Sequence, residues 1–120
     1  MAKLTRLSGD AEIVSKLRAY ANVRTVTDTA TVDADDNSGL VIGTKGTGFT
    51  ITVPADVFEV GNTFDIMQGG AGAVTVAAGS NATVNVDATY TKVTAGQYSI
   101  ITVTCYAANT FVVTGNAVPA

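Results

Sequence analysis

The sequence predicts an all-β protein: a single small antiparallel sandwich or barrel of about eight strands, preceded by a short N-terminal helical arm. Three observations lead to this fold class. Thr supplies about one residue in six, and β-branched residues favour strands over helices. Short runs that alternate apolar and Thr residues recur along the chain, which is the period of a strand. Gly, Asn and Ser separate these runs and mark the turns. We expect the 120 residues to form one core.

Residues 1–24 are predicted to form the N-terminal arm, and residues 25–120 the β domain. Ser8 or Asp10 is placed to cap a short helix. Apolar residues follow at helical spacing, namely Ile13, Val14, Leu17 and Tyr20 or Ala21. The arm holds five basic residues against two acidic ones, a charge of +3, and the remainder holds two against eight, a charge of −6. The helix either covers an open end of the β domain or packs on a partner subunit or a neighbouring protein.

The β domain is predicted to begin with a strand over residues 25–32, where Thr alternates with Val26, Asp28, Ala30 and Val32. The turn DADDNSG, residues 33–39, has the acidic spacing that opens a calcium loop. Its Gly comes one place late, however, and the twelfth position is Thr44 instead of Glu, so we expect an Asx-rich turn. A short strand is predicted over residues 40–42. In GTKGTG, residues 43–48, a Lys lies among glycines, but a strand follows, so we expect a hairpin loop and no phosphate loop.

The middle of the chain predicts strands over residues 49–53, 64–68, 74–76 and 82–86. Phe49, Ile51 and Val53 are core candidates, and Pro54 ends their strand. The glycine run QGGAGAV contains part of a dinucleotide-binding motif, but its third glycine position is Thr75 and no helix follows. We therefore expect a β-hairpin or a bulged corner at residues 69–73.

Residues 87–98, DATYTKVTAGQY, show no clear period and are long enough for a surface loop, where binding residues tend to lie. The candidates for ligand contact in this loop are Tyr90, Lys92, Gln97 and Tyr98. Alternatively, the two tyrosines are half-buried with their hydroxyl groups at the surface. The last strands are predicted around residues 101–105 and 111–115, with Cys105 as a small core residue.

Several classes of function find no support in the composition. The chain has no His, and its single Cys cannot form an internal disulfide or a cysteine-built metal site. Without His, an enzyme would depend on carboxylate chemistry, and Asp33, Asp35 and Asp36 lie in a turn too polar to raise a carboxyl pKa. We therefore predict no enzyme, no cofactor and no metal. No run approaches the roughly 18 apolar residues of a membrane span, and the arm is too short and too mixed in charge for nucleic acid.

The chain from about residue 38 to 115 resembles a β module of tailed-bacteriophage structural proteins, found in tail fibres, head fibres and capsid-decoration proteins. The matching segments are FTITVP at 49–54, GNTFDIMQ at 61–68, GAGAVTV at 70–76, AGSNATVNV at 78–86, AGQYSIITV at 95–103 and NTFVVTG at 109–115. The sequence departs from the module at Phe111, where Trp is frequent. The resemblance implies a virion structural protein, trimeric or otherwise multivalent, and it supplies no catalytic residues.

Within this class, a short chain with an N-terminal arm and no heptads favours a capsid decoration or cement protein. We expect the arm to contact the capsid or adjacent copies through Lys3, Leu4, Arg6, Leu7, Ile13, Leu17 and Arg24. The expected partner is the major capsid protein or another virion protein. We expect the protein to form a homo-oligomer, a trimer being favoured, and to bind neither nucleic acid nor a membrane. The expected location is the virion, after synthesis in the host cytoplasm. The alternative is a tail- or head-fibre module that binds a host receptor or glycan.

Overall fold

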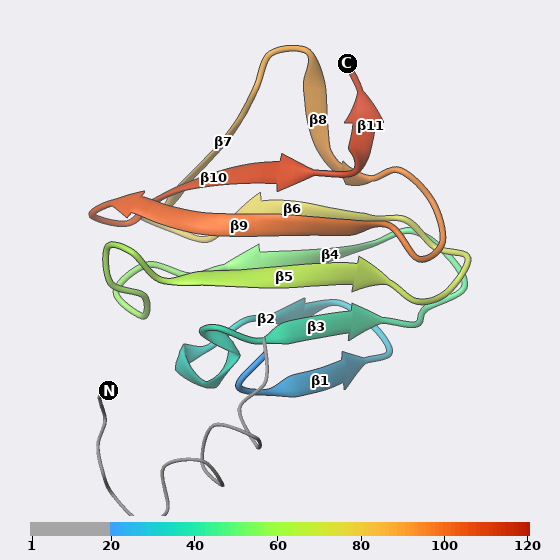
Figure 1. Ribbon diagram of the computed structural model, residues 1–120, viewed down its shortest axis with the longest axis horizontal. Coiled ribbons are helices and arrows are strands. Elements are labelled where there is room, and N and C mark those ends of the chain that lie inside the picture. The colour runs from blue at the N-terminus through green and yellow to red at the C-terminus, as the bar shows by residue number, and fades with distance from the viewer. Residues whose placement is uncertain (1–19) are drawn as a thin grey trace, which may run out of the picture.

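The computed structural model describes residues 20–120, which form eleven strands in two sheets and one short 3₁₀ turn, η1 (Ala34–Asp36) (Figure 1). The six-stranded sheet contains, in spatial order, β1 (Val23–Val26), β3 (Leu40–Gly43), β5 (Thr63–Gln68), β9 (Ile100–Ala107), β10 (Thr110–Gly115) and β7 (Thr83–Val86). The five-stranded sheet contains β11 (Ala117–Pro119), β8 (Tyr90–Thr94), β6 (Val74–Ala78), β4 (Phe49–Val53) and β2 (Ala30–Thr31). The predicted all-β class is confirmed. The predicted arm helix falls largely on residues 1–19, outside the described residues. No helix of the described part is long and apolar enough to cross a membrane.

The first six strands stack in a solenoid-like manner, which differs from the predicted antiparallel sandwich of about eight strands. The chain passes from one sheet to the other after every strand, so each strand pairs with the next but one. The four resulting pairs, β1 with β3, β3 with β5, β2 with β4 and β4 with β6, are all parallel. The predicted strand over residues 25–32 is accordingly two strands, β1 and β2, in different sheets. Because a hairpin joins antiparallel neighbours, such crossovers exclude hairpins in this half of the fold.

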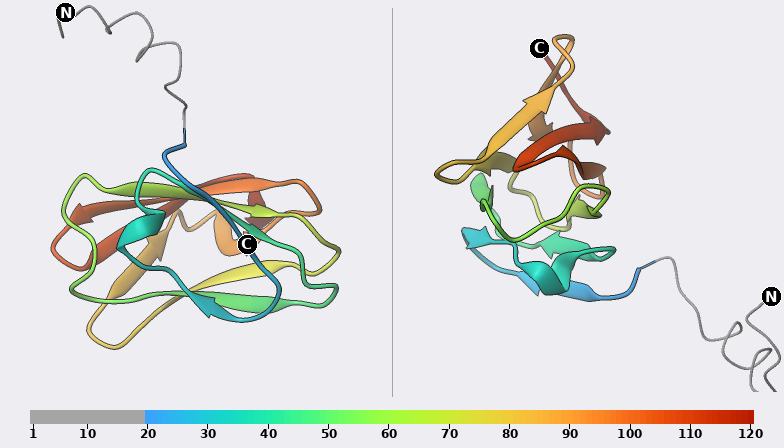
Figure 2. Two further views of the ribbon diagram at one scale, coloured as in Figure 1. Left: turned by 90° about the horizontal axis from the view of Figure 1, so that it is seen from below. Right: turned by 90° about the vertical axis from the view of Figure 1, so that its left-hand side faces the viewer.

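The second half of the chain closes the structure with mostly antiparallel pairs. Strand β9 lies antiparallel to β5, and β10 antiparallel to β9, whereas β7 joins β10 in parallel. In the other sheet, β8 pairs with β6 and β11 pairs with β8, both antiparallel. Figure 2 shows the sheets as opposed layers, and Figure 1 shows β8 and β11 running away from the remaining strands.

The core lies between the two sheets and follows from the alternation in each strand. Inward residues include Val41, Ile66 and Ile101 from one sheet and Ile51 and Val76 from the other. Three aromatic rings fill the end near the β4–β5 connection: Phe58 stacks on Phe64 with centroids 5.2 Å apart and meets the edge of Phe111 at 5.9 Å. The predicted core positions Phe49, Ile51, Val53 and Cys105 are all buried.

The two glycine-rich connections are stacked corners. Residues 43–48, predicted as a hairpin loop, instead carry the chain from β3 to β4 in the opposite sheet, and residues 69–73 carry it from β5 to β6. The amide of Gly72 donates to the carbonyl of Lys45 over 3.0 Å. A Cβ added at Gly72 would lie 2.0 Å from the carbonyl oxygen of Thr47, so this close backbone approach requires glycine. Of the two predicted forms for residues 69–73, the corner is confirmed and the hairpin is wrong.

Candidate functional site

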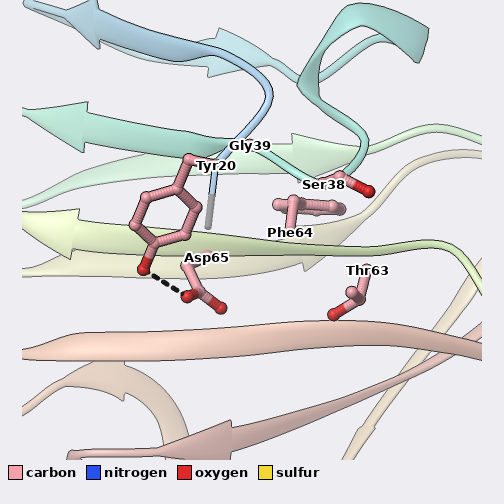
Figure 3. Close-up of a pocket in the computed structure, with 6 residues that line it drawn as sticks. All are labelled: Tyr20, Ser38, Gly39, Thr63, Phe64 and Asp65. Carbon is pink, nitrogen blue, oxygen red and sulfur yellow. Dashed lines mark hydrogen bonds between the residues drawn. The ribbon is translucent and has the colours of Figure 1, made fainter. Parts of the chain in front are cut away.

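The N-terminal end of the described chain is attached to the outer face of the six-stranded sheet by Tyr20 (Figure 3). Its hydroxyl donates to Oδ2 of Asp65 over 2.6 Å. Asp65 points outward because its neighbours on β5, Phe64 and Ile66, point into the core. The paired residue on β9, Thr102, donates its hydroxyl to Oδ1 of Asp65, also over 2.6 Å. Just after Tyr20, the amide of Ala21 donates to the carbonyl of Ser38 over 2.8 Å.

A shallow pocket of about 260 Å³ lies beside this contact, lined by Tyr20, Ser38, Gly39, Thr63, Phe64 and Asp65 (Figure 3). The hydrogen bond to Asp65, with help from burial and from the negative charge, raises the pKa of Tyr20 above its ordinary value of 10.0. The phenol therefore keeps its proton at neutral pH, and each oxygen of Asp65 already accepts a hydrogen bond. This geometry suits an anchor for the N-terminal residues. Sequence reasoning missed it because Tyr20 and Asp65 are 45 positions apart.

Arg24, predicted to contact the capsid, has an internal partner. Its Nε donates to Oδ1 of Asp36 over 3.0 Å, and its Nη2 donates to Oδ2 over 2.9 Å. These bonds raise the pKa of Arg24 above its ordinary value. The carboxylate of Asp36 is only 1% exposed and also accepts from the amide of Asp33. We call the segment that contains β1, β2 and η1 the first coil of the solenoid. We call Arg24 and Asp36 the end pair, because they close this first coil by joining β1 to η1. The other predicted arm residues, Lys3 to Leu17, lie outside the described residues.

The acidic turn at residues 33–39 is the Asx-rich turn that the sequence predicts. Oδ1 of Asp33 accepts from the amide of Asp35 over 2.9 Å and caps η1. Asn37 forms a hydrogen bond to β5, since its Oδ1 accepts from the amide of Thr63 over 3.3 Å. Within residues 20–120, no three or more His, Cys, Asp or Glu side chains form a group that could hold a metal ion.

The predicted ligand loop, residues 87–98, contains strand β8 and does not gather its four candidate residues. Tyr90 begins β8, whose five residues place its two ends about 13 Å apart. Lys92 donates to the carbonyl of Val84 over 3.2 Å. Gln97 donates to the carbonyl of Gly69 over 3.1 Å, and the amide of Tyr98 donates to the carbonyl of Gln68 over 2.6 Å. Gln97 and Tyr98 therefore bind the glycine corner beyond the far end of β8, and the exposed Tyr98 ring lies apart from Tyr90.

The neighbouring Thr94 and Gln68 join the two sheets at the same corner. The hydroxyl of Thr94 donates to Oε1 of Gln68 over 2.6 Å and accepts from the amide of Val74 over 2.9 Å. Nε2 of Gln68 donates to the carbonyls of Gly70 and Ala71. Since Gln68 and Thr94 are both buried, this network gives buried polar groups partners within the protein.

Tyr90 lines a second pocket, of about 230 Å³, with Val86, Asp87, Val113, Thr114, Gly115 and Ala117. Hydrogen bonds from the Thr89 hydroxyl and amide lower the pKa of Asp87, so this carboxylate is ionised at neutral pH. The pocket arises where β7 and β10 run in parallel beside β8 and β11. No local pattern in the sequence indicates that pairing.

Comparison with family models, with curated proteins and with solved structures found no match to this chain.

Proposed function

We propose that the protein is a non-enzymatic virion structural protein, a capsid decoration or cement protein that binds the assembled shell through its N-terminal residues and displays its β domain outward. The partner is the major capsid protein or another virion protein, and the protein acts as a homo-oligomer, a trimer being favoured. The resemblance of residues 38–115 to the phage β module supports this proposal, as does the all-β fold of the described chain.

The observation that carries the proposal is the attachment of the arm at Tyr20. An arm that grips a shell holds the β domain in place only if the junction between the two is firm. The Tyr20 hydroxyl bond to Asp65 and the Ala21 amide bond to Ser38 supply such a junction on one sheet face. Because Arg24 is committed to Asp36, we assign the grip to the residues that precede Tyr20: Lys3, Leu4, Arg6, Leu7, Ile13 and Leu17.

A reconstitution assay with purified particles that lack the protein tests this assignment. We expect the full-length variant Lys3→Glu/Arg6→Glu to lose at least about tenfold in particle occupancy, because charge reversal turns attraction to an acidic surface into repulsion. The variant Lys45→Glu/Lys92→Glu makes the same change in net charge within the β domain and serves as the matched control. Equal occupancy for both double variants and the unmodified chain would contradict the proposed grip.

The second candidate function is a head- or tail-fibre module that binds a host receptor or glycan. The observation that favours it is the Tyr90 pocket, where Tyr90, a residue that is 47% exposed, lies beside the ionised Asp87. An aromatic face with a few polar groups is a frequent composition for small-ligand sites. On a glycan array we expect binding that Tyr90→Ala removes and that Tyr98→Ala, which changes another exposed tyrosine, retains. An array without hits would count against this candidate.

A further inference from the structure

The outer face of the six-stranded sheet carries an aliphatic stripe made of Val23, Leu40, Ile42, Met67 and Ile100. The strand registers place these residues side by side: Val23 lies opposite Leu40, Ile42 opposite Met67, and Met67 opposite Ile100. Val23 is 54% exposed and Ile100 is 38% exposed, while the other three are half-buried. The stripe therefore crosses four strands and leaves apolar surface in contact with water.

The opposite outer face differs. The outward positions of the five-stranded sheet include a group of threonines, where Thr31 lies opposite Thr52 and Thr50 opposite Thr75. Thr hydroxyls are well solvated, so these positions do not require a protein partner. The outward aliphatic residues of the five-stranded sheet are fewer, namely Val93, which lies opposite Thr75, and Val118 on β11. The five residues of the stripe lie side by side, and a contiguous apolar patch on one face marks an interaction surface.

The face that carries the stripe has almost no charge. Asp65 is the one charged side chain among the outward residues of its six strands, and Tyr20 and Thr102 already hold both of its oxygens. The other seven acidic side chains of residues 20–120 lie elsewhere. Two copies of a chain with a net charge of −3 meet with the least repulsion through such a face. Charge depletion with an aromatic residue, here Tyr20, is also typical of the centre of protein interfaces.

The face is also large enough for self-association. Six strands spaced about 4.8 Å apart, with on average about five residues of 3.3 Å each, give roughly 500 Å² of flat area. Two such faces together bury about 1,000 Å², which reaches the roughly 1,000 Å² of a specific interface. Pairing through the β1 edge is less suitable, since β1 has four residues and the charged end pair points inward there.

We propose that a second copy of this chain packs on the outer face of the six-stranded sheet, with the aliphatic stripe at the centre of the contact. Two sheets stacked face to face are a common packing, and a shared face makes the contact self-complementary. This inference rests on the homo-oligomer of the proposed function and names the surface through which two copies associate, a contact that does not require a capsid.

Light scattering after size exclusion, on the full-length chain over a range of concentrations, tests the contact. We expect the unmodified chain to have the mass of two chains, and Ile100→Arg to raise the dissociation constant at least about 100-fold, because an unpaired charge in a closed interface is costly. Val118→Arg is the matched control, since Val118 on β11 is 37% exposed, nearly the same as Ile100, and lies off the face. The control is expected to retain the assembly.

Oxidative cross-linking gives a second readout that does not depend on a buried charge. We expect Ile100→Cys to form covalently linked pairs, while Val118→Cys does not, and the native Cys105 is buried in both variants. If the unmodified chain is monomeric in light scattering at about 100 µM, the proposal is overturned, and residues 1–19 or another protein would be the remaining candidates to cover this face. Equal dissociation by the two Arg variants, or equal cross-linking by the two Cys variants, would overturn it as well. Loss of capsid binding with retained self-association would refute the proposed function alone.

Discussion

Replacing Arg24 by Met tests the end pair. The sequence predicted that Arg24 contacts the capsid, whereas in the structure its guanidinium group binds Asp36 within the fold. The substitution keeps the aliphatic length of the side chain and removes its charge. Asp36, which is 1% exposed, then loses the two guanidinium bonds of 3.0 and 2.9 Å and keeps the amide of Asp33. A carboxylate that is buried with a single donor is strongly unfavourable.

The expected cost follows from the burial of each partner. Removing one partner of a buried ion pair costs about 3–5 kcal/mol. Because the Arg24 side chain is 34% exposed, water screens part of the attraction, and we expect about 2–3 kcal/mol for Arg24→Met. Asp36→Asn retains an acceptor for the amide of Asp33 and frees Arg24 toward water, so we expect about 1–2 kcal/mol. The double variant is expected to cost at least about 1 kcal/mol less than the sum of the two.

Urea unfolding of the unmodified chain, the two single variants and the double variant measures these free energies, provided that the slope of the unfolding free energy against urea concentration is the same for all four. Lys45→Met is the control, because it removes the exposed pair that Lys45 forms with Asp28 over 3.0 Å and is expected to leave the midpoint unchanged. If Arg24→Met proves as harmless as Lys45→Met, or if the double variant shows no coupling, the end pair does not close the first coil. Arg24 would then return to the set of residues that bind the capsid.

Two further predictions concern the corner and the anchor. Gly72→Ala is expected to cost about 3 kcal/mol in urea unfolding, because its Cβ would lie 2.0 Å from the carbonyl oxygen of Thr47. Gly46→Ala, which meets nothing within 4 Å, is expected to change stability by less than about 0.5 kcal/mol, and equal costs would contradict the stacked corner. Tyr20→Phe is expected to cost about 1 kcal/mol at neutral pH, as the bond to Asp65 is lost. Because the pKa of Tyr20 is raised in the folded chain, this stabilisation is complete below the unfolded value of 10.0 and disappears as pH rises above it. A cost that stays constant up to pH 11 would refute the assigned bond.

The positions of most strands and much of the core were predictable because they depend on local alternation. Phe49, Ile51 and Val53 were expected to face inward, and all three are buried between the sheets. The same reasoning identified the Asx-rich turn around Asp33 and the core role of Cys105. In each case the relevant preference belongs to a residue and its immediate neighbours.

The pairing of strands was not predictable from the same patterns. A glycine-rich segment such as GTKGTG has the same local preferences in a hairpin and in a corner that crosses between sheets. The contacts that decide lie between coils, such as the 3.0 Å bond from the amide of Gly72 to the carbonyl of Lys45. The prediction of a surface loop over residues 87–98 missed β8 for a related reason, since this strand is held by pairing with β6 and β11, which the local sequence does not specify.

By itself, the sequence determined that this protein is built from short strands around one apolar core, and that an enzyme, if present, would have to work without His. Those properties follow from the amino-acid composition and from the alternation of apolar and polar residues along each strand. Only the tertiary structure decided that Arg24 closes a coil, that Tyr20 anchors the N-terminal residues, and that five exposed or half-buried aliphatic residues share one face. The physical reason is that each of these roles depends on contacts between residues far apart in the chain, which local preferences do not specify.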